Sequence, residues 1–138
     1  MGSLDVYYAP EHGERPVKVE TPEQVDALID RLRAESSDDV PILMQLYVSD
    51  DIHGQELSAG VRGNRGVLRY AGRDWFEGVY SVGGAPVCDD AVLYFYMGND
   101  TEFPSDAEID LDAVRNGVKE YLATDGARPH GVVWRPDH

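Results

Sequence analysis

The pattern of hydrophobic and polar residues divides the chain into short apolar segments separated by turn residues. The longest apolar run comprises residues 91–97, AVLYFYM, and lies between Asp90 and Gly98. A run of this length and composition between turn residues predicts a central strand that is buried on both faces. Residues 41–48, PILMQLYV, form the second dense run. We expect these two strands to lie close together in one sheet.

Shorter alternating segments predict further strands, some of which pair as hairpins. Gly13 lies in the link between the first two segments, and Gly63 and Asn64 lie between another two. Turn residues between alternating segments are typical of antiparallel hairpins. The segments are residues 4–9 and 16–20 for the first hairpin, residues 56–62 and 66–70 for the second, and residues 74–82 and 131–135 for two additional strands.

Two segments have the 3.6-residue period of amphipathic helices. The first begins at Thr21, and the following Pro22 and Gln24 fit the N-terminus of a capped helix. The second begins after Asp110 and ends at Gly126. The apolar stripes are Val25, Leu28, Ile29 and Leu32 in the first helix, and Leu111, Val114, Val118, Tyr121 and Leu122 in the second.

The order of these elements favours a single α+β domain over residues 1–138. Runs of antiparallel strands with two separate helices pack as a sheet that the helices cover. We expect a mainly antiparallel, twisted sheet of about seven to nine strands with both helices on one face, which leaves much of the other face available. The length of 138 residues is typical of one domain.

The charge of the chain narrows its possible partners. It contains 26 Asp and Glu against 12 Lys and Arg, a net charge of -14. Such a surface repels nucleic acids and anionic lipids, so we expect no direct nucleic-acid partner and no membrane partner. Solubility alone, or a basic protein partner, could account for the charge. The N-terminus lacks the basic and apolar pattern of a signal peptide, and we expect a cytoplasmic protein.

The sequence carries no motif typical of an enzyme. A nucleophile elbow, a zinc-protease motif and a zinc-deaminase motif are all absent from it. His53 follows Asp50 and Asp51 in a predicted turn, but a metal site needs at least three converging ligands. We therefore expect no enzyme, no metal and no cofactor. A small enzyme stays open as an alternative if a closed cleft brings His53 to one of these aspartates.

Acidic residues are densest directly after the longest apolar run. Asp110 and Asp112 are explained by the favourable position of acids at a helix N-terminus. The other acids of this segment are predicted to lie in a loop. Trp75 is either an aromatic anchor beside them or a residue of the core. The candidate partner-binding residues are therefore Asp100, Glu102, Asp106, Glu108, Trp75, Glu77, Asp89 and Asp90. Plain solvation is the alternative interpretation of these acids.

Four arginines lie within twelve positions of this acidic chain, at Arg62, Arg65, Arg69 and Arg73. They could clamp a phosphate, but arginines on the solvent face of a hairpin more often pair with neighbouring acids. We expect Asp74 and Glu77 to be such partners.

Five segments of the chain together carry a resemblance to a known family. They are YFYMGNDTEFP (residues 94–104), VRNGVKEYLATDG (114–126), RPHGVVW (128–134), TPEQVDALIDRL (21–32) and GNRGVLRY (63–70). In these segments the chain resembles the first-catalogued immunity protein family of bacterial polymorphic toxin systems. The resemblance implies a compact α+β protein that neutralises a toxin by binding its C-terminal toxic domain, chiefly a nucleic-acid deaminase, and it implies no catalytic residues.

These inferences lead to a functional hypothesis. An immunity protein that occludes the basic site of a toxin would use its acidic face in place of the polynucleotide. The alternatives are an acidic, non-catalytic adaptor and a homodimeric interaction module, which would expose an apolar face.

Overall fold

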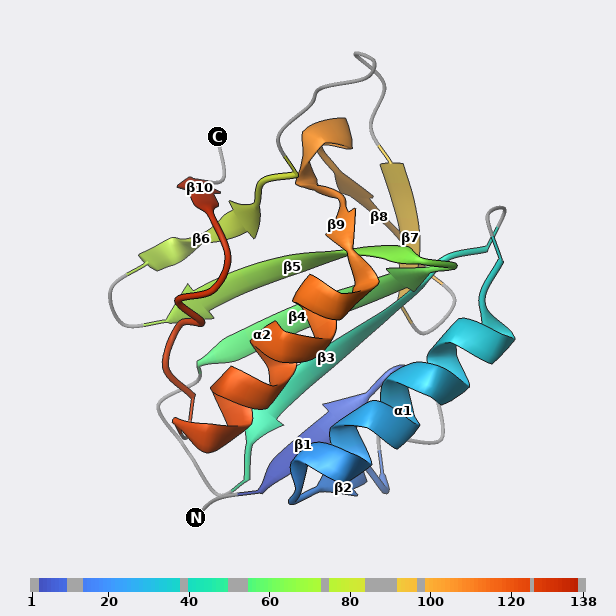
Figure 1. Ribbon diagram of the computed structural model, residues 1–138, viewed down its shortest axis with the longest axis vertical. Coiled ribbons are helices and arrows are strands. Elements are labelled where there is room, and N and C mark those ends of the chain that lie inside the picture. Colours follow the sequence, from blue (N-terminus) through green and yellow to red (C-terminus); the bar gives the residue numbers. More distant parts are fainter. Residues whose placement is uncertain are drawn as a thin grey trace.

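The computed structural model shows two helices packed on one sheet (Figure 1). It describes residues 3–9, 14–37, 40–49, 55–72, 75–83, 92–96, 99–124 and 126–136. The elements among them are β1 (Leu4–Tyr7), β2 (Val17–Val19), α1 (Pro22–Glu35), β3 (Ile42–Val48), β4 (Glu56–Arg62), β5 (Arg65–Gly72), β6 (Trp75–Ser81), β7 (Val92–Tyr96), β8 (Asn99–Phe103), the 3-10 helix η2 (Ser105–Ala107), β9 (Ile109–Asp110), α2 (Leu111–Ala123) and β10 (Trp134–Pro136).

The sheet has the strand order β10-β6-β5-β4-β3-β1-β2, and neighbouring strands along this path are antiparallel. The two predicted hairpins are confirmed, with Leu4 opposite Val19 in the first and Arg62 opposite Arg65 in the second. The predicted α+β class is also confirmed. The described residues form ten strands, more than expected, because the acidic segment contributes β8 and the two-residue β9.

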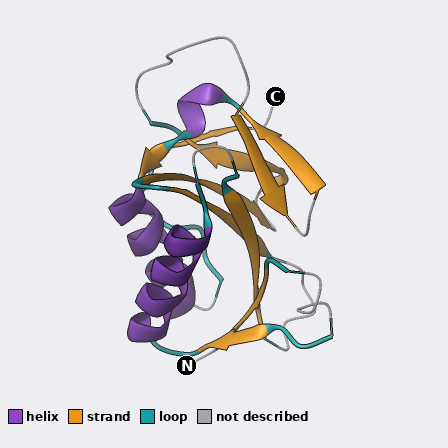
Figure 2. Cartoon of the chain, turned by 90° about the vertical axis from the view of Figure 1, so that its right-hand side faces the viewer, coloured by secondary structure: helices purple, strands orange, loops and turns teal. Residues whose placement is uncertain are grey.

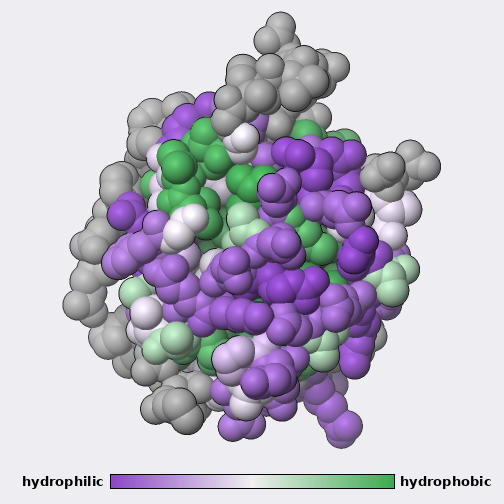
Figure 3. All heavy atoms as spheres, viewed as in Figure 1, coloured by the Kyte–Doolittle hydropathy of each residue, from purple (hydrophilic) through white to green (hydrophobic). Residues whose placement is uncertain are grey.

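Both helices cover the same face of the sheet (Figure 2). The predicted capping box of α1 is present: the Gln24 amide N–H donates to Thr21 Oγ1 at 3.2 Å, and Gln24 Oε1 accepts from the Thr21 amide at 3.2 Å. Asp110 is the N-cap residue of α2, but its side chain makes no capping hydrogen bond. The outer surface of the helices is mainly hydrophilic, and hydrophobic residues gather near β6 and β10 (Figure 3).

The larger hydrophobic core lies between the helices and the sheet. Leu57, Ala59 and Val61 alternate along β4 and are fully buried, as their spacing predicts. Both predicted helical stripes contribute to this core. The helices therefore occupy the apolar face of the sheet, and the residues between these positions point to the opposite face.

The strand predicted within residues 91–97 is present as β7, but the prediction that it is a central strand buried on both faces is wrong. β7 pairs with β8, and it contacts β3 through a single parallel pair, Ile42 with Phe95. Its side chains are not uniformly buried, since Tyr94 is buried whereas Leu93 is 40% exposed. The hairpin of β7 and β8 instead turns away from the helices (Figure 2). The expected proximity of this strand to residues 41–48 is confirmed.

One side of this hairpin closes a second, smaller core. Its buried members are Leu43, Val67, Tyr94, Phe103 and Ala107. A Cβ atom on Gly60 would lie 2.5 Å from Tyr94 Cδ2, so the missing side chain at Gly60 lets the Tyr94 ring lie directly on β4. The hairpin therefore covers part of the sheet face that was expected to be free.

Candidate partner-binding surface

The segment that links the hairpin to α2, residues 104–110, is tied to the sheet by backbone contacts. We call it the strap. The Ser81 hydroxyl donates to the Ala107 carbonyl at 2.7 Å and accepts from the Leu68 amide at 3.0 Å. The Gly83 amide donates to the Asp106 carbonyl at 2.6 Å. These hydrogen bonds fix the strap across β5 and β6, so its side chains have defined surroundings.

Glu108 is the centre of a buried polar cluster beneath the hairpin. The Arg62 guanidinium binds its carboxylate through two nitrogens, with Nε 2.7 Å from Oε2. The Tyr94 hydroxyl donates to the same Oε2 at 2.8 Å, and Arg65 Nη2 donates to the Glu108 carbonyl at 3.1 Å. Only 8% of Glu108 is exposed. This carboxylate therefore connects β4, β7 and the strap.

The surroundings of Glu108 favour its charged form. Burial alone would raise the pKa of the carboxyl group, but the hydrogen bonds from Arg62 and Tyr94 outweigh burial and hold that pKa below its usual value. Burial and the hydrogen bond to Glu108 raise the pKa of the Tyr94 hydroxyl, which stays a donor. At neutral pH Glu108 is thus an ionised group whose partners belong to the same chain.

Asp106 is paired within the chain in the same way. Its carboxylate accepts two parallel hydrogen bonds from Arg135, at 2.6 and 2.7 Å, and its side chain is 19% exposed. Bidentate pairs of this kind fix geometry as well as charge. The pair joins the strap to β10, at the C-terminal end of the described chain.

The arginines of the second hairpin pair with acids, as predicted, but with more distant ones. Arg62 binds Glu108, and Arg65 Nη1 lies 4.0 Å from Asp110 Oδ1. Asp74 and Arg73 lie outside the described residues. The acids that pair with Arg62 and Arg65 therefore come from the strap.

Asp100 and Glu102 have different surroundings from the strap acids. Both lie in β8, so the expectation that they occupy a loop is wrong. β8 pairs with β7 in an antiparallel register that runs from Tyr96 opposite Asn99 to Val92 opposite Phe103. Both side chains are exposed. Among the predicted acids whose side chains the structure describes, these are the two that are exposed.

Two apolar residues lie beside these acids. Leu93 is opposite Glu102 and Phe95 is opposite Asp100 in the antiparallel register. Tyr94 and Phe103 belong to the second core, and side chains alternate across a strand, so these four residues share the other side of the hairpin. Phe95 is only partly buried. We call Leu93, Phe95, Asp100 and Glu102 the outer hairpin face.

The side chains of the other four candidate residues lie outside the described part of the structure. Trp75 and Glu77 lie in β6, which pairs with β5 and β10, and their side chains fall outside the described part of the structure. Asp89 and Asp90 lie outside the described residues. The eight candidates thus separate into an exposed pair, a pair bound within the chain, and four whose side chains are not described.

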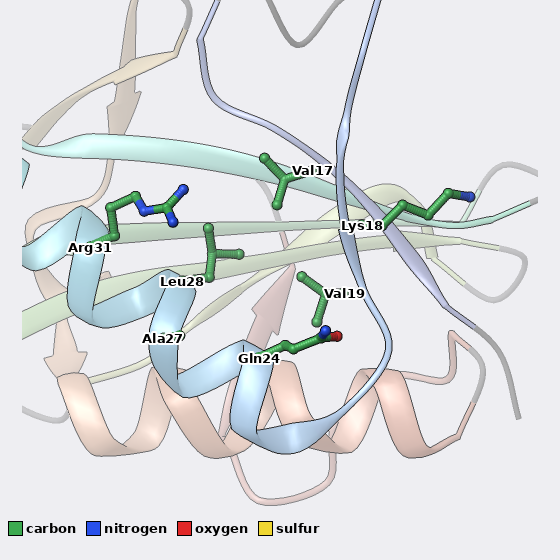
Figure 4. A pocket seen from close by; sticks show the side chains of 7 residues that line it. All are labelled: Val17, Lys18, Val19, Gln24, Ala27, Leu28 and Arg31. Atoms are coloured by element: carbon green, nitrogen blue, oxygen red, sulfur yellow. The ribbon is translucent and has the colours of Figure 1, made fainter.

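A shallow groove of about 170 Å³ runs between β2 and α1 (Figure 4). Its floor is apolar, and Lys18 points away from α1 while Arg31 lies along the rim. The lining residues are Val17, Lys18, Val19, Gln24, Ala27, Leu28 and Arg31, none of which is an acid or a histidine. The groove therefore offers no acid–base pair.

The described residues contain neither a metal-binding cluster nor a membrane-spanning helix. No group of three or more His, Cys, Asp or Glu side chains could hold a metal ion among them. His53, Asp50 and Asp51, the alternative enzymatic group, lie outside the described residues. Within the same part of the chain, neither α1 nor α2 combines the length and apolarity needed to cross a bilayer.

Leu93 and Phe95 are surface residues that the sequence did not predict. Their apolar run, residues 91–97, contains no charged residue and therefore predicts a strand buried on both faces. A signal for the correct arrangement was present downstream, since Asp100 and Glu102 are two residues apart and must share one face if their segment is a strand. The partner strand of an amphipathic strand exposes its own alternate residues.

The fold and this surface define a small α+β protein that presents exposed acids together with apolar residues, as proteins that bind other proteins do. The chain belongs to the immunity protein family described as "Immunity protein Imm1", whose family model matches residues 13–136. This membership supports a role as an immunity protein, which implies a toxin partner. A comparison with curated proteins gives no match to the chain.

Proposed function

We propose that this protein acts in the bacterial cytoplasm, where it binds a cognate toxin domain of a polymorphic toxin system through the outer hairpin face. The toxin domain is a nucleic-acid deaminase or nuclease, and the bound immunity protein covers the basic site that would hold the polynucleotide. The observation that carries this proposal is the register of β7 and β8, which places Leu93 and Phe95 beside the exposed carboxylates of Glu102 and Asp100.

The composition of the outer hairpin face fits a basic protein partner. Apolar side chains that leave water on binding supply affinity, and acids around them steer a positively charged partner and fix its orientation. The net charge of -14 adds a long-range attraction for the same partner. A site that evolved to hold nucleic acid has the complementary charge.

The same acids argue against a homodimer formed at this edge. β8 pairs only with β7, so its other side is an open strand edge within the described sheet. Charged side chains on an edge strand oppose pairing with another copy, because Asp100 and Glu102 would approach the same acids of the second copy. A partner of opposite charge does not meet this repulsion.

Co-expression tests the proposal. The C-terminal domain of the protein encoded by the neighbouring reading frame is expressed in a bacterial host with wild-type protein or with the double variant Leu93→Ser/Phe95→Ser. We expect the wild type to protect growth, and the variant to protect poorly because it loses two apolar anchors. Binding of the purified pair, measured by biolayer interferometry, should weaken roughly 30-fold.

Val133→Ser is the matched control, because Val133 is 69% exposed and lies away from the hairpin near β10. It should protect and bind as the wild type does. Circular dichroism and thermal unfolding establish that both variants are folded. The proposal fails if folded Leu93→Ser/Phe95→Ser protein still binds with wild-type affinity, or if the neighbouring domain does not bind the wild type at all.

A further inference from the structure

The sheet face opposite the helices carries a cluster of tyrosines around one carboxylate. Gln45 and Tyr47 alternate along β3, and Tyr7 of β1 is opposite Gln45 in the register. Continuing the register of β3 and β4, in which Leu46 is opposite Leu57, places Glu56 opposite Tyr47. These residues therefore lie on the same face, which the two helices leave uncovered.

Contacts between the rings show that the cluster is compact. The Tyr7 and Tyr47 rings meet edge to face, with centroids 5.7 Å apart. The Tyr47 hydroxyl donates to Gln45 Oε1 at 2.8 Å. Tyr96 packs against the second core, whose member Leu43 lies two residues before Gln45 on β3. Burial, followed by the charge of Glu56, raises the pKa of both Tyr47 and Tyr96. All of these side chains remain partly exposed.

Glu56 carries a charge that no described cation balances. Lys18 lies on the same face, but its Nζ atom is 3.2 Å from Asp5 and 3.5 Å from Ser49 Oγ. Arg62, at the other end of β4, is bound to Glu108. Among the described residues, none of the ion pairs includes Glu56.

Arg69 is the nearest described cation by register, since it is opposite Ser58, and Glu56 is opposite Ala71, two residues further along β5. Its side chain extends the other way, toward β6. The guanidinium carbon lies 5.9 Å from the centroid of the Tyr80 ring. Gly78, which has a φ of +90°, leaves space there, because a Cβ atom would lie 2.5 Å from Arg69 Nη2. The fold thus directs its own arginine away from Glu56.

We propose that Tyr7, Tyr47, Tyr96 and Glu56 form a cation socket that receives one lysine or arginine side chain of a protein partner. The carboxylate supplies the opposite charge, and the electron-rich ring faces attract a cation. Exposed tyrosines also combine large contact area with little loss of conformational freedom on binding. This proposal adds a second contact to the proposed function. It rests on that function, which identifies the protein partner.

The socket can be tested without the toxin domain. The probe is the peptide acetyl-Gly-Arg-Gly-amide, and its neutral analogue carries citrulline in place of arginine. Aromatic ¹H–¹³C NMR spectra of the full chain are recorded during titration. We expect saturable shifts of the Tyr7, Tyr47 and Tyr96 ring signals with the arginine peptide, with a Kd on the order of 10 mM. The citrulline peptide should produce no saturable shift.

Glu56→Gln keeps the shape of the side chain and removes its charge, and it should weaken peptide binding about fivefold or more. Glu23→Gln is the matched control, since Glu23 is an exposed acid in the first turn of α1. It should bind as the wild type does. The socket is contradicted if citrulline binds equally well, if the tyrosine signals do not respond, or if the two variants weaken binding equally. None of these results bears on the outer hairpin face, so the proposed function would stand.

Discussion

Two pairs of acids that lie close together in the sequence have opposite surroundings in the structure. Asp100 and Glu102 project from β8 into solvent beside Leu93 and Phe95. Asp106 and Glu108 lie in the strap, where arginines of the same chain bind both carboxylates. Glu108 also accepts a hydrogen bond from Tyr94 of the hairpin, and this contact helps to hold the exposed pair at a fixed position on the surface.

Acids that lie close together in a sequence therefore need not have the same role. The carboxylates of Asp106 and Glu108 have satisfied hydrogen bonds and a compensated charge, so little of their field reaches a partner. The exposed acids of β8 cost the fold little and keep their charge available. Substitutions in the two pairs should therefore separate effects on stability from effects on binding.

The largest effect is expected for Glu108→Ala. The substitution leaves the partly buried Arg62 guanidinium without its carboxylate and the Tyr94 hydroxyl without its acceptor. Removing one partner of a buried ion pair is strongly destabilising, and we expect a loss of about 3 kcal/mol in the free energy of unfolding. Urea denaturation followed by circular dichroism measures this value.

Asp100→Ala is the matched control for this prediction, because it removes an exposed acid of the same segment. Its free energy of unfolding should stay within about 0.5 kcal/mol of the wild type. Equal losses in the two variants would show that the strap and hairpin acids do not differ in the way their contacts indicate.

Charge reversal of the exposed acids Asp100 and Glu102 should change binding much more than stability. Asp100→Lys/Glu102→Lys should slow association with the toxin domain roughly tenfold at low salt and reduce the salt dependence of the association rate, because the steering charges are inverted. Stopped-flow measurements at several ionic strengths test this. The free energy of unfolding should change by less than about 1 kcal/mol.

Glu20→Lys/Glu23→Lys carries the same change in net charge at the start of α1, at the opposite end of the molecule from the hairpin (Figure 1). It should slow association less than the hairpin variant. If the two variants slow association equally, the net charge of the chain, and not the outer hairpin face, controls encounter.

The sequence was a good guide where structure depends on neighbouring residues. The start of α1 follows from Thr21 and Gln24, which are three residues apart and bind each other. The hairpin at Gly63 follows from a turn between alternating segments. In both cases the residues that decide the structure lie within one or two turns of chain, so their spacing can be read directly.

The site depends on contacts that local spacing does not encode. Arg62 and Glu108 are 46 residues apart, and Arg135 and Asp106 are 29 residues apart. The sequence indicated that arginines would pair with acids, but it could not select which acids, because that choice depends on where the strap crosses the sheet. The exposure of Leu93 likewise follows from the position of the hairpin at an edge.

The smallest expected effect is the pH dependence that Glu108 gives to stability. Its pKa is lowered in the folded protein, whereas an unfolded glutamate has a pKa of about 4.3. Its charge-dependent contribution is therefore fully present above about pH 4.3 and is lost as the pH falls through the lower, folded-state pKa. Glu108→Gln keeps a hydrogen-bond acceptor but lacks this contribution. The free energies of unfolding of the wild type and this variant, measured with urea from pH 7 downward, should differ most near neutral pH and converge in acid. Parallel curves would mean that Arg62 and Tyr94 do not stabilise the charged form of Glu108, and the strap acid would then differ from Asp100 in burial alone.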